Sequence, residues 1–395
     1  MPAAKFRVFR YTFRMWRLLL IVALLSALSC SSSAQWHMQD SHTSADLRGV
    51  HSIGNGIAWA NGTNGTVLRT ADDGEHWQLC ATPSGAEALD FRGIQGFDAN
   101  TAIVMSSGKG NLSRLYKTTD GCRTWNLVFT NPDAPDGSFK AIQFAPGIGR
   151  ENGRAGGLIG DPVSGKFAEY RTNDYGKSWQ KSERAWQTSA EVGEVLFAAS
   201  NSSFLTIRGW TLFVTGGSVT RSRTLEEHVK HDPSIAVRYV GGDLPLVHGV
   251  SAGAASVAAH LGPDSVADSD AAKYIVRAVH VGDALVVVGG DYQQPDKSVG
   301  TCAVSTDGSL HWSASKTLPH GYRSAVAYDA PNNTWITVGP NGTDISADDG
   351  RIWRSLTPNH TDTPDADKNW NALSLPFAVG PKGRIGKLRT EVLKP

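Results

Sequence analysis

Cysteine, unbalanced charge and long hydrophobic runs are all scarce in this sequence of 395 residues. Four cysteines are too few for a disulfide-stabilised scaffold, and their spacing matches no metal site. One bridge is possible among Cys80, Cys122 and Cys302, and Cys80–Cys122 is the preferred pair. The 38 Lys and Arg residues balance 37 Asp and Glu residues, which gives no general attraction to nucleic acid. We therefore expect neither a nucleic-acid partner nor a bound metal.

Cofactor motifs are missing as well. No Gly-x-Gly-x-x-Gly segment opens a helix, which removes the usual dinucleotide fingerprint. The 12 histidines contain no His-x-His or His-x-x-x-His pair of the kind that binds zinc. We predict that the protein uses no cofactor. What is present, 40% apolar and 19% charged residues, is ordinary for a globular chain.

Residues 1–34 differ from the rest of the chain. Basic residues precede the apolar run 18–28, and small residues follow at 32–34, in the order of a secretory signal peptide. The run is about half of the roughly 20 residues that cross a membrane, so we expect no transmembrane segment in the mature protein. Lipidation at Cys30 is the alternative anchor. The mature chain, residues 35–395, is predicted to be exported to the periplasm or the cell exterior.

A short polar segment is repeated five times. The clearest copy, RTNDYGKSWQ at 171–180, has the pattern Ser/Thr-x-Asp-x-Gly-x-Ser/Thr-Trp and resembles the Asp-box (BNR) repeat. In such a turn the carboxylate and hydroxyl accept from backbone N–H groups, while a residue such as Gly176 takes a positive φ. We predict structural hairpin turns, not catalytic acids. Their aspartates and tryptophans are Asp72 and Trp77, Asp120 and Trp125, Asp174 and Trp179, Asp307 and Trp312, and Asp348 and Trp353.

A second repeated phrase, illustrated by FRGI at 91–94, marks seven units. The second residues of the phrases are Arg48, Arg92, Lys140, Glu194, Arg277, Arg323 and Asn371, at intervals of 44, 48, 54, 83, 46 and 48 residues. A repeat of about 45 residues with short alternating segments is typical of a four-stranded propeller blade. The sequence therefore predicts an all-β, seven-bladed β-propeller in which each phrase begins the innermost strand.

The two ends of the predicted ring are expected to meet. The seventh unit has room for three strands, and the segment at Trp36 would supply the fourth strand and remove an exposed sheet edge. The interval of 83 residues indicates an insertion, at about 225–270.

Three longer segments resemble a known family. They are GIAWANGTNGTVLRTADDGEHW, VVVGGDYQQPDKSVGTCAVSTDG and GYRSAVAYDAPNNTWITVGPNGTDISADDG. Together they are similar to the Ycf48/HCF136-like photosystem II assembly and stability factors, in a non-photosynthetic, secreted branch. The resemblance implies the propeller fold and a role in the assembly or stability of another protein.

Five cations recur at the start of the predicted inner strands and would line one rim of the channel. They are Arg48, Arg92, Lys140, Arg277 and Arg323, with Tyr322 beside the last. If open to solvent, they would bind a protein segment, an anion or a glycan, because arginine binds oxyanions through two parallel hydrogen bonds. Alternatively, each is tied to a carbonyl or carboxylate of a neighbouring blade. Repetition does not separate these two interpretations.

Acids and tyrosines expected on the same rim offer a catalytic alternative. Asp161 and Asp291 fall between second and third strands, and Glu194 enters the fourth blade. With Tyr292 or Tyr322 they would form an acid/base set similar to that of sialidases, which are also Asp-box propellers. Sialidases, however, have six blades and an Arg-Ile-Pro motif that this sequence lacks. We favour a monomeric binding protein, with a sialidase-like glycoside hydrolase or glycan-binding protein as the alternative.

Overall fold

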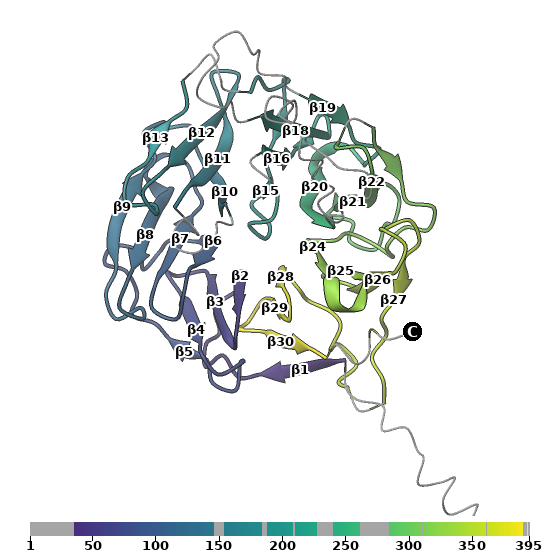
Figure 1. The fold of residues 1–395 in the computed structure, drawn as a ribbon, viewed down its shortest axis with the longest axis horizontal. Coiled ribbons are helices and arrows are strands. Elements are labelled where there is room, and N and C mark those ends of the chain that lie inside the picture. Colours follow the sequence, from purple (N-terminus) through teal and green to yellow (C-terminus); the bar gives the residue numbers. More distant parts are fainter. Residues whose placement is uncertain are drawn as a thin grey trace, which may run out of the picture.

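The computed structural model of this chain describes residues 35–145, 154–183, 188–207, 210–226, 240–260, 284–309, 311–360, 362–389 and 393. Seven antiparallel sheets are arranged in a ring, which Figure 1 shows face-on. The helices of this described part are two single 3-10 turns, η1 (Gly110–Leu112) and η5 (Ala330–Asn332). The prediction of an all-β, seven-bladed propeller is confirmed.

The first three blades are regular four-stranded meanders. Blade one consists of β2 (Leu47–Gly54), β3 (Ile57–Gly62), β4 (Val67–Thr70) and β5 (Gln78–Leu79). Blade two consists of β6 (Phe91–Gly96), β7 (Ala102–Ser106), β8 (Arg114–Thr118) and β9 (Asn126–Thr130). Blade three consists of β10 (Phe139–Phe144), β11 (Gly156–Val163), β12 (Lys166–Thr172) and β13 (Gln180–Lys181).

The remaining blades complete the ring. Blade four consists of β15 (Phe204–Ile207), β16 (Trp210–Val214), β18 (Arg221–Glu226) and β19 (Val240–Asp243). Blade five consists of β20 (Gly249–His260), β21 (Ala284–Asp291), β22 (Cys302–Ser305) and β23 (Ser313–Ala314), extended by the short β14 (Glu194–Val195) and β17 (Gly216–Gly217). Blade six consists of β24 (Ala325–Asp329), β25 (Thr334–Gly339), β26 (Gly342–Ser346) and β27 (Arg354–Ser355). Blade seven consists of β28 (Ala372–Ser374), β29 (Phe377–Val379), β30 (Ile385–Leu388) and β1 (Trp36–Gln39).

The N-terminal strand closes the ring, as predicted. β1 pairs antiparallel with β30, and Trp36 lies opposite Leu388. The Trp36 ring is almost fully buried, and its centroid lies 5.0 Å from that of Trp370. Two distant parts of the sequence therefore share one sheet, and β30 has no open edge.

The hydrophobic core is divided among the interfaces between blades. Seven clusters of buried apolar side chains occur in the described residues, each joining two neighbouring blades. Between blades one and two, for example, Trp59 packs with Phe91 and Ile94. The cluster between blades three and four is the smallest, with six buried members. Stability is thus spread around the ring.

Blades four and five differ from the sequence prediction. The phrase around Glu194 does not begin an inner strand, because β14 pairs with β17 at the edge of the fifth sheet, while β15 is the inner strand of blade four. The segment 225–270 is not one insertion, because it contains the regular strands β19 and β20. The phrase with Arg277 falls between β20 and β21 and lies outside the described residues.

The five polar turns have the hydrogen bonds that a tight hairpin needs. In blade three, Thr172 Oγ1 donates to Asp174 Oδ1 (2.8 Å) and accepts from the backbone N–H of Gly176 (3.0 Å). Asp174 Oδ1 also accepts from the N–H of Ser178 (3.0 Å). Gly176 has φ 72°, and Cys122 has φ 63° at the equivalent position of blade two. Cys122 also forms the expected disulfide with Cys80, which joins blades one and two.

Removing one of these carboxylates is expected to destabilise the protein in a pH-dependent way. Partial burial pushes the pKa of Asp174 up, but the hydrogen bonds from Ser178 and Thr172 outweigh it and hold the pKa at about 2. A lowered carboxylate pKa stabilises the fold above the ordinary value near 4, and the contribution is lost as pH falls toward 2. Asp174→Ala should cost about 1 kcal/mol at pH 7, as for other carboxylates that accept from backbone N–H groups.

Urea unfolding at pH 7 and at pH 2.5 measures this effect. The difference between Asp174→Ala and the unmodified chain should shrink at the lower pH. Lys177→Ala, an exposed change in the same turn, serves as the control and should alter stability by less than about 0.5 kcal/mol. Equal loss of stability at both pH values would contradict the assigned role.

Candidate functional site

The centre of the ring is crossed by residues 196–203, which we call the central segment. It lies inside the ring, next to β15 (Figure 1). Asn201 Oδ1 accepts from the backbone N–H of Ile142 in blade three (2.9 Å), and its Nδ2 donates to the carbonyl of Ile142 (3.1 Å). On the other side, Ser200 Oγ donates to the carbonyl of Ser324 at the start of blade six (2.8 Å). The segment therefore occupies part of the channel between blades three and six.

The rim on which the inner strands begin carries an ion-paired network that touches the central segment. Arg92 Nη2 lies 2.7 Å from Asp90 Oδ2, and its Nη1 donates to the carbonyl of Ala198 (3.1 Å). Arg48 reaches Asp46 and Asp90, each at 3.7 Å. The side chains of Arg48 and Arg92 remain 27% and 29% exposed. These two arginines are therefore within reach of a ligand on this rim.

A second ion pair on the same rim also holds the central segment. Lys140 Nζ lies 2.8 Å from Asp161 Oδ2, and Asp161 Oδ1 accepts from the backbone N–H of Leu196 (3.2 Å). We name the two networks together the channel-mouth cluster. It consists of Asp46, Arg48, Asp90, Arg92, Lys140 and Asp161. Three cations face three carboxylates, so the cluster has no net charge.

Two tyrosines lie close to this cluster. Burial raises the pKa of Tyr322, the neighbouring Tyr292 raises it further, and the charge of Arg92 lowers it. The Tyr322 phenol is therefore protonated at neutral pH. Tyr292 is 52% exposed and presents an aromatic surface at the end of β21.

Arg323 is not open to solvent, so the first of the two interpretations of the rim cations does not apply to it. Its side chain is 0% exposed, and Nε donates to Asp344 Oδ2 (2.8 Å) while Nη1 donates to the carbonyl of Tyr322 (2.8 Å). His320 Nδ1 lies 2.7 Å from the other oxygen of Asp344. Arg323 is therefore part of the interior of blade six and does not meet a ligand. Arg277, the fifth predicted cation, lies outside the described residues.

The proposed catalytic acids are engaged in structural contacts. Glu194 is buried, accepts from Thr215 Oγ1 (2.6 Å) and pairs with Arg223 Nη2 (2.7 Å). Asp161 holds Lys140 and the central segment, as described above. Asp291 accepts from the backbone N–H of Gln293 (2.9 Å) at the turn that follows β21. Of the predicted arginines that the structure describes, Arg48 and Arg92 meet at Asp90 and Arg323 is buried, so the described residues do not bring three open arginines together as a sialidase-like site requires.

Two further arrangements resemble parts of a serine hydrolase, and neither has the required geometry. Ser355 and Asp344 both contact His320 at the same ring nitrogen, Nδ1 (3.0 and 2.7 Å), whereas a catalytic triad uses opposite nitrogens. The segment Gly249–Gly253 has Gly-x-Ser-x-Gly spacing, with Ser251 at its centre. It lies within β20, and not on the strand-to-helix turn that exposes such a nucleophile.

In the part of the chain that the structure describes, no group of three or more His, Cys, Asp and Glu side chains is placed to hold a metal ion. In the same residues, no helix has the length and apolar character to cross a membrane.

The repeated phrase did not predict two features of this rim: the carboxylate partners of the arginines, and the central segment. The partners Asp46 and Asp90 each stand two residues before an arginine, in Asp46-Leu47-Arg48 and Asp90-Phe91-Arg92, and this Asp-x-Arg pattern was the available signal. The central segment carries no comparable pattern, because its Ser and Asn residues are those of any polar loop.

Known proteins resemble this chain in part of its sequence and in its fold. No protein-family model matches the chain. A photosystem II assembly lipoprotein, Ycf48 of Synechococcus sp. (strain CC9902), is 25% identical over 185 residues, which cover 45% of this chain and 48% of that protein. The match thus spans about half the length of that relative.

Solved structures extend the likeness to most of the chain. A structure of YCF48 bound to D1 peptide has a TM-score of 0.57 and 18% identity, and the match covers 90% of this chain and 97% of that one. YCF48 from Cyanidioschyzon merolae has a TM-score of 0.50 and 15% identity, with 91% and 100% covered. At these identities the structures support the fold alone.

Proposed function

We propose that this Ycf48-like propeller binds an extended segment of another protein at its channel-mouth cluster and so assists the assembly or stability of that protein. The observation that carries the proposal is the pair Arg48 and Arg92, partly exposed on a rim whose channel is crossed by the central segment. The printed names of the similar proteins, an assembly lipoprotein and a propeller with a bound peptide, support the same class of function.

The charge balance of the cluster favours a polypeptide over a strongly acidic ligand. Three cations paired with three carboxylates exert little net field, so a polyanion gains little from long-range attraction. An extended peptide backbone presents alternating N–H and C=O groups, which match a rim of alternating carboxylate acceptors and arginine donors. The exposed ring of Tyr292 adds an apolar surface for a side chain of that segment.

Export is part of the proposal. Residues 1–34, with the proposed signal peptide and Cys30, lie outside the described residues. The Cys80–Cys122 disulfide supports an oxidising compartment, and the similar Ycf48 is named a lipoprotein. We propose a monomer in the periplasm or outside the cell, in a non-photosynthetic branch of Ycf48-like proteins.

Photo-crosslinking tests the binding site. A photoreactive phenylalanine derivative at position 292 should capture a polypeptide in cells, whereas the same group at Ile352 should not. Ile352 is the matched control because it is 47% exposed and lies in an Asp turn on the opposite rim. A synthetic peptide from the captured segment should then bind the purified chain.

The variant Arg48→Gln tests whether Arg48 contributes to peptide binding. Arg48 contacts carboxylates at 3.7 Å, and the bonds to the central segment come from Arg92 and Asp161, so the fold should be retained. We expect this variant to bind the peptide about tenfold more weakly. That loss corresponds to the free energy of about one charge-assisted hydrogen bond. Equal capture at positions 292 and 352, or unchanged affinity of the variant, would refute the site.

A further inference from the structure

The central segment already occupies part of the channel-mouth cluster with its own backbone. Arg92 Nη1 donates to the carbonyl of Ala198 (3.1 Å), and the backbone N–H of Leu196 donates to Asp161 Oδ1 (3.2 Å). In an extended chain, backbone groups two residues apart point to the same side. An arginine thus holds a carbonyl, and a carboxylate holds an N–H. These are the contacts that the proposed function assigns to a segment of the partner protein.

The side chains that hold the segment are oriented by other partners as well. Arg92 Nε and Nη2 lie 2.8 and 2.7 Å from Asp90 Oδ2. Asp161 Oδ2 lies 2.8 Å from Lys140 Nζ, and the backbone N–H of Asp161 donates to the carbonyl of Ser138 (2.9 Å). Both side chains therefore stay in place when the segment leaves. A preorganised site of this kind loses little entropy when a second backbone binds.

Arg48 occupies the equivalent place in blade one, but it holds no part of the segment among the described residues. Its carboxylate contacts there, with Asp46 and Asp90, are 3.7 Å long, and Arg48 Nε has no hydrogen-bond partner. A partner can therefore bind Arg48 without displacing a group. The donor that Arg92 gives to Ala198 becomes free only when that carbonyl moves away.

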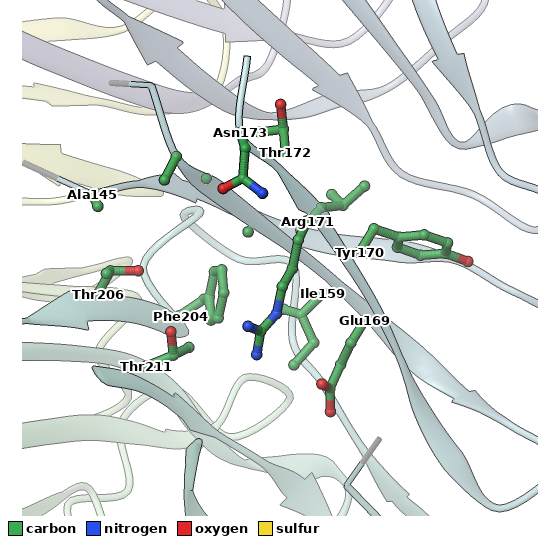
Figure 2. Close-up of a pocket in the computed structure, with 14 residues that line it drawn as sticks. Ala145, Ile159, Glu169, Tyr170, Arg171, Thr172, Asn173, Phe204, Thr206 and Thr211 are labelled. Atoms are coloured by element: carbon green, nitrogen blue, oxygen red, sulfur yellow. The ribbon is translucent and has the colours of Figure 1, made fainter. Parts of the chain in front are cut away.

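One anchor of the segment lies at its start. Leu196 is 3% exposed and packs in the apolar cluster between blades three and four, together with Ile159 and Phe204. Figure 2 shows Ile159 and Phe204 where they also line the neighbouring pocket. Displacement of Leu196 would expose a buried apolar side chain, which is costly. This end of the segment therefore stays attached.

The other anchor follows residue 199. Asn201 bonds to both backbone groups of Ile142, and the backbone N–H of Val257 donates to the carbonyl of Ser202 (2.9 Å). Between the two anchors, residues 197–199 make one hydrogen bond in the part of the chain that the structure describes, the bond from Arg92 to Ala198. The hold on this short stretch therefore depends on Arg92.

We infer that residues 197–199 compete with the partner's segment for Arg92, and that the partner displaces them when it binds. This regulation rests on the proposed function, because it acts on the same site. The anchors keep the displaced stretch tethered, so its carbonyl returns to Arg92 when the partner leaves. A short tether holds a competing group at an effective concentration that is roughly millimolar. The internal contact thus raises the affinity that a partner needs, and a weakly binding unfolded chain is excluded.

Thiol labelling of the free mature chain tests whether Arg92 holds the stretch. Ala199→Cys introduces a thiol at a half-buried position, whereas the native free Cys302 is buried and its pKa is raised to about 12 by that burial. The introduced thiol should react with iodoacetamide at least fivefold faster when Arg92→Gln is added. Arg48→Gln is the matched control and should change the rate less than twofold. Equal rates with and without Arg92→Gln would overturn the inference.

The same thiol reports displacement by a partner. A saturating amount of the synthetic peptide from the captured segment should raise the labelling rate of Ala199→Cys at least fivefold, because the stretch is released. Slower labelling would show that the peptide covers the stretch, and an unchanged rate would show that it binds elsewhere. Either result contradicts the competition.

Peptide affinity gives a second measure. Ala198→Gly combined with Ala199→Gly makes the stretch more flexible and so weakens the internal contact. This double variant should bind the peptide at least threefold more tightly than the unmodified chain. Ala330→Gly, an exposed change on the opposite rim, should leave the affinity unchanged. Unaltered affinity in the double variant would count against an internal competitor.

A failure of the proposed function has a different signature. If the peptide does not bind the unmodified chain, the proposed function fails, and the competition fails with it. If the peptide binds but the labelling rate does not rise, only the competition fails. The melting temperature of Ala199→Cys should match that of the unmodified chain, so that the labelling rate describes the native state.

Discussion

Deleting residues 35–44 should lower the free energy of unfolding by at least about 4 kcal/mol. The deletion removes β1, four residues paired with β30, and with it the Trp36 ring that is 2% exposed against Trp370. Loss of a buried tryptophan side chain alone costs about 3–5 kcal/mol. Typical proteins are stable by only about 5–15 kcal/mol, so the effect is a large part of the total.

Urea unfolding of the deletion and of two point variants checks this expectation. Trp36→Ala should reproduce most of the loss. His37→Ala, an exposed residue of the same strand, should change stability by less than about 0.5 kcal/mol. The deletion should also leave β30 as an open edge and promote self-association on gel filtration. An unchanged unfolding curve would show that ring closure contributes no stability.

Breaking the buried ion pair of blade six should be as damaging. Arg323 and Asp344 are 0% and 2% exposed at the side chain, and each satisfies the other. Asp344→Ala leaves an uncompensated guanidinium in the interior, for which we expect a loss of about 3–5 kcal/mol. Replacing both partners by leucine should restore much of it, because blade one has Leu68 at the position of Asp344.

The pH dependence of this pair has a defined sign. Burial alone would raise the pKa of Asp344, but His320 and Arg323 outweigh it and lower that pKa. Its contribution is therefore complete above the ordinary carboxylate pKa and is lost as pH falls through the lower value of the folded state. The double leucine variant should lose less stability between pH 5 and pH 3 than the unmodified chain. A double variant as unstable as Asp344→Ala would show that packing, not charge, sets the loss.

The Asp turns illustrate what a short sequence pattern specifies. In blade three, the hydrogen bonds that the Asp174 and Thr172 side chains make in the turn join residues no more than six apart. Hydrogen bonds over so short a span form wherever the pattern occurs, so the turns and their spacing predict the blades. The spacing of the units also predicts the closure by Trp36, because the last unit has only three strands and leaves one edge unpaired.

The exposure of the rim arginines, in contrast, does not follow from the repeat. The repeat places Arg48, Arg92 and Arg323 at equivalent positions, yet two are partly exposed and one is fully buried. The difference arises from their partners. Asp90 belongs to the neighbouring blade of Arg48, whereas Asp344 is an interior residue of blade six. The packing of the strands, and not the repeat, determines which carboxylate lies beside each arginine.

By itself, the sequence determined the number of blades, the polar turns and the closure of the ring, because these depend on local hydrogen bonds and on counting strands. Only the tertiary structure decided that the central segment crosses the channel and that the rim charges cancel. The physical reason is that burial and charge compensation depend on groups brought together across blades, often more than 40 residues apart in the chain.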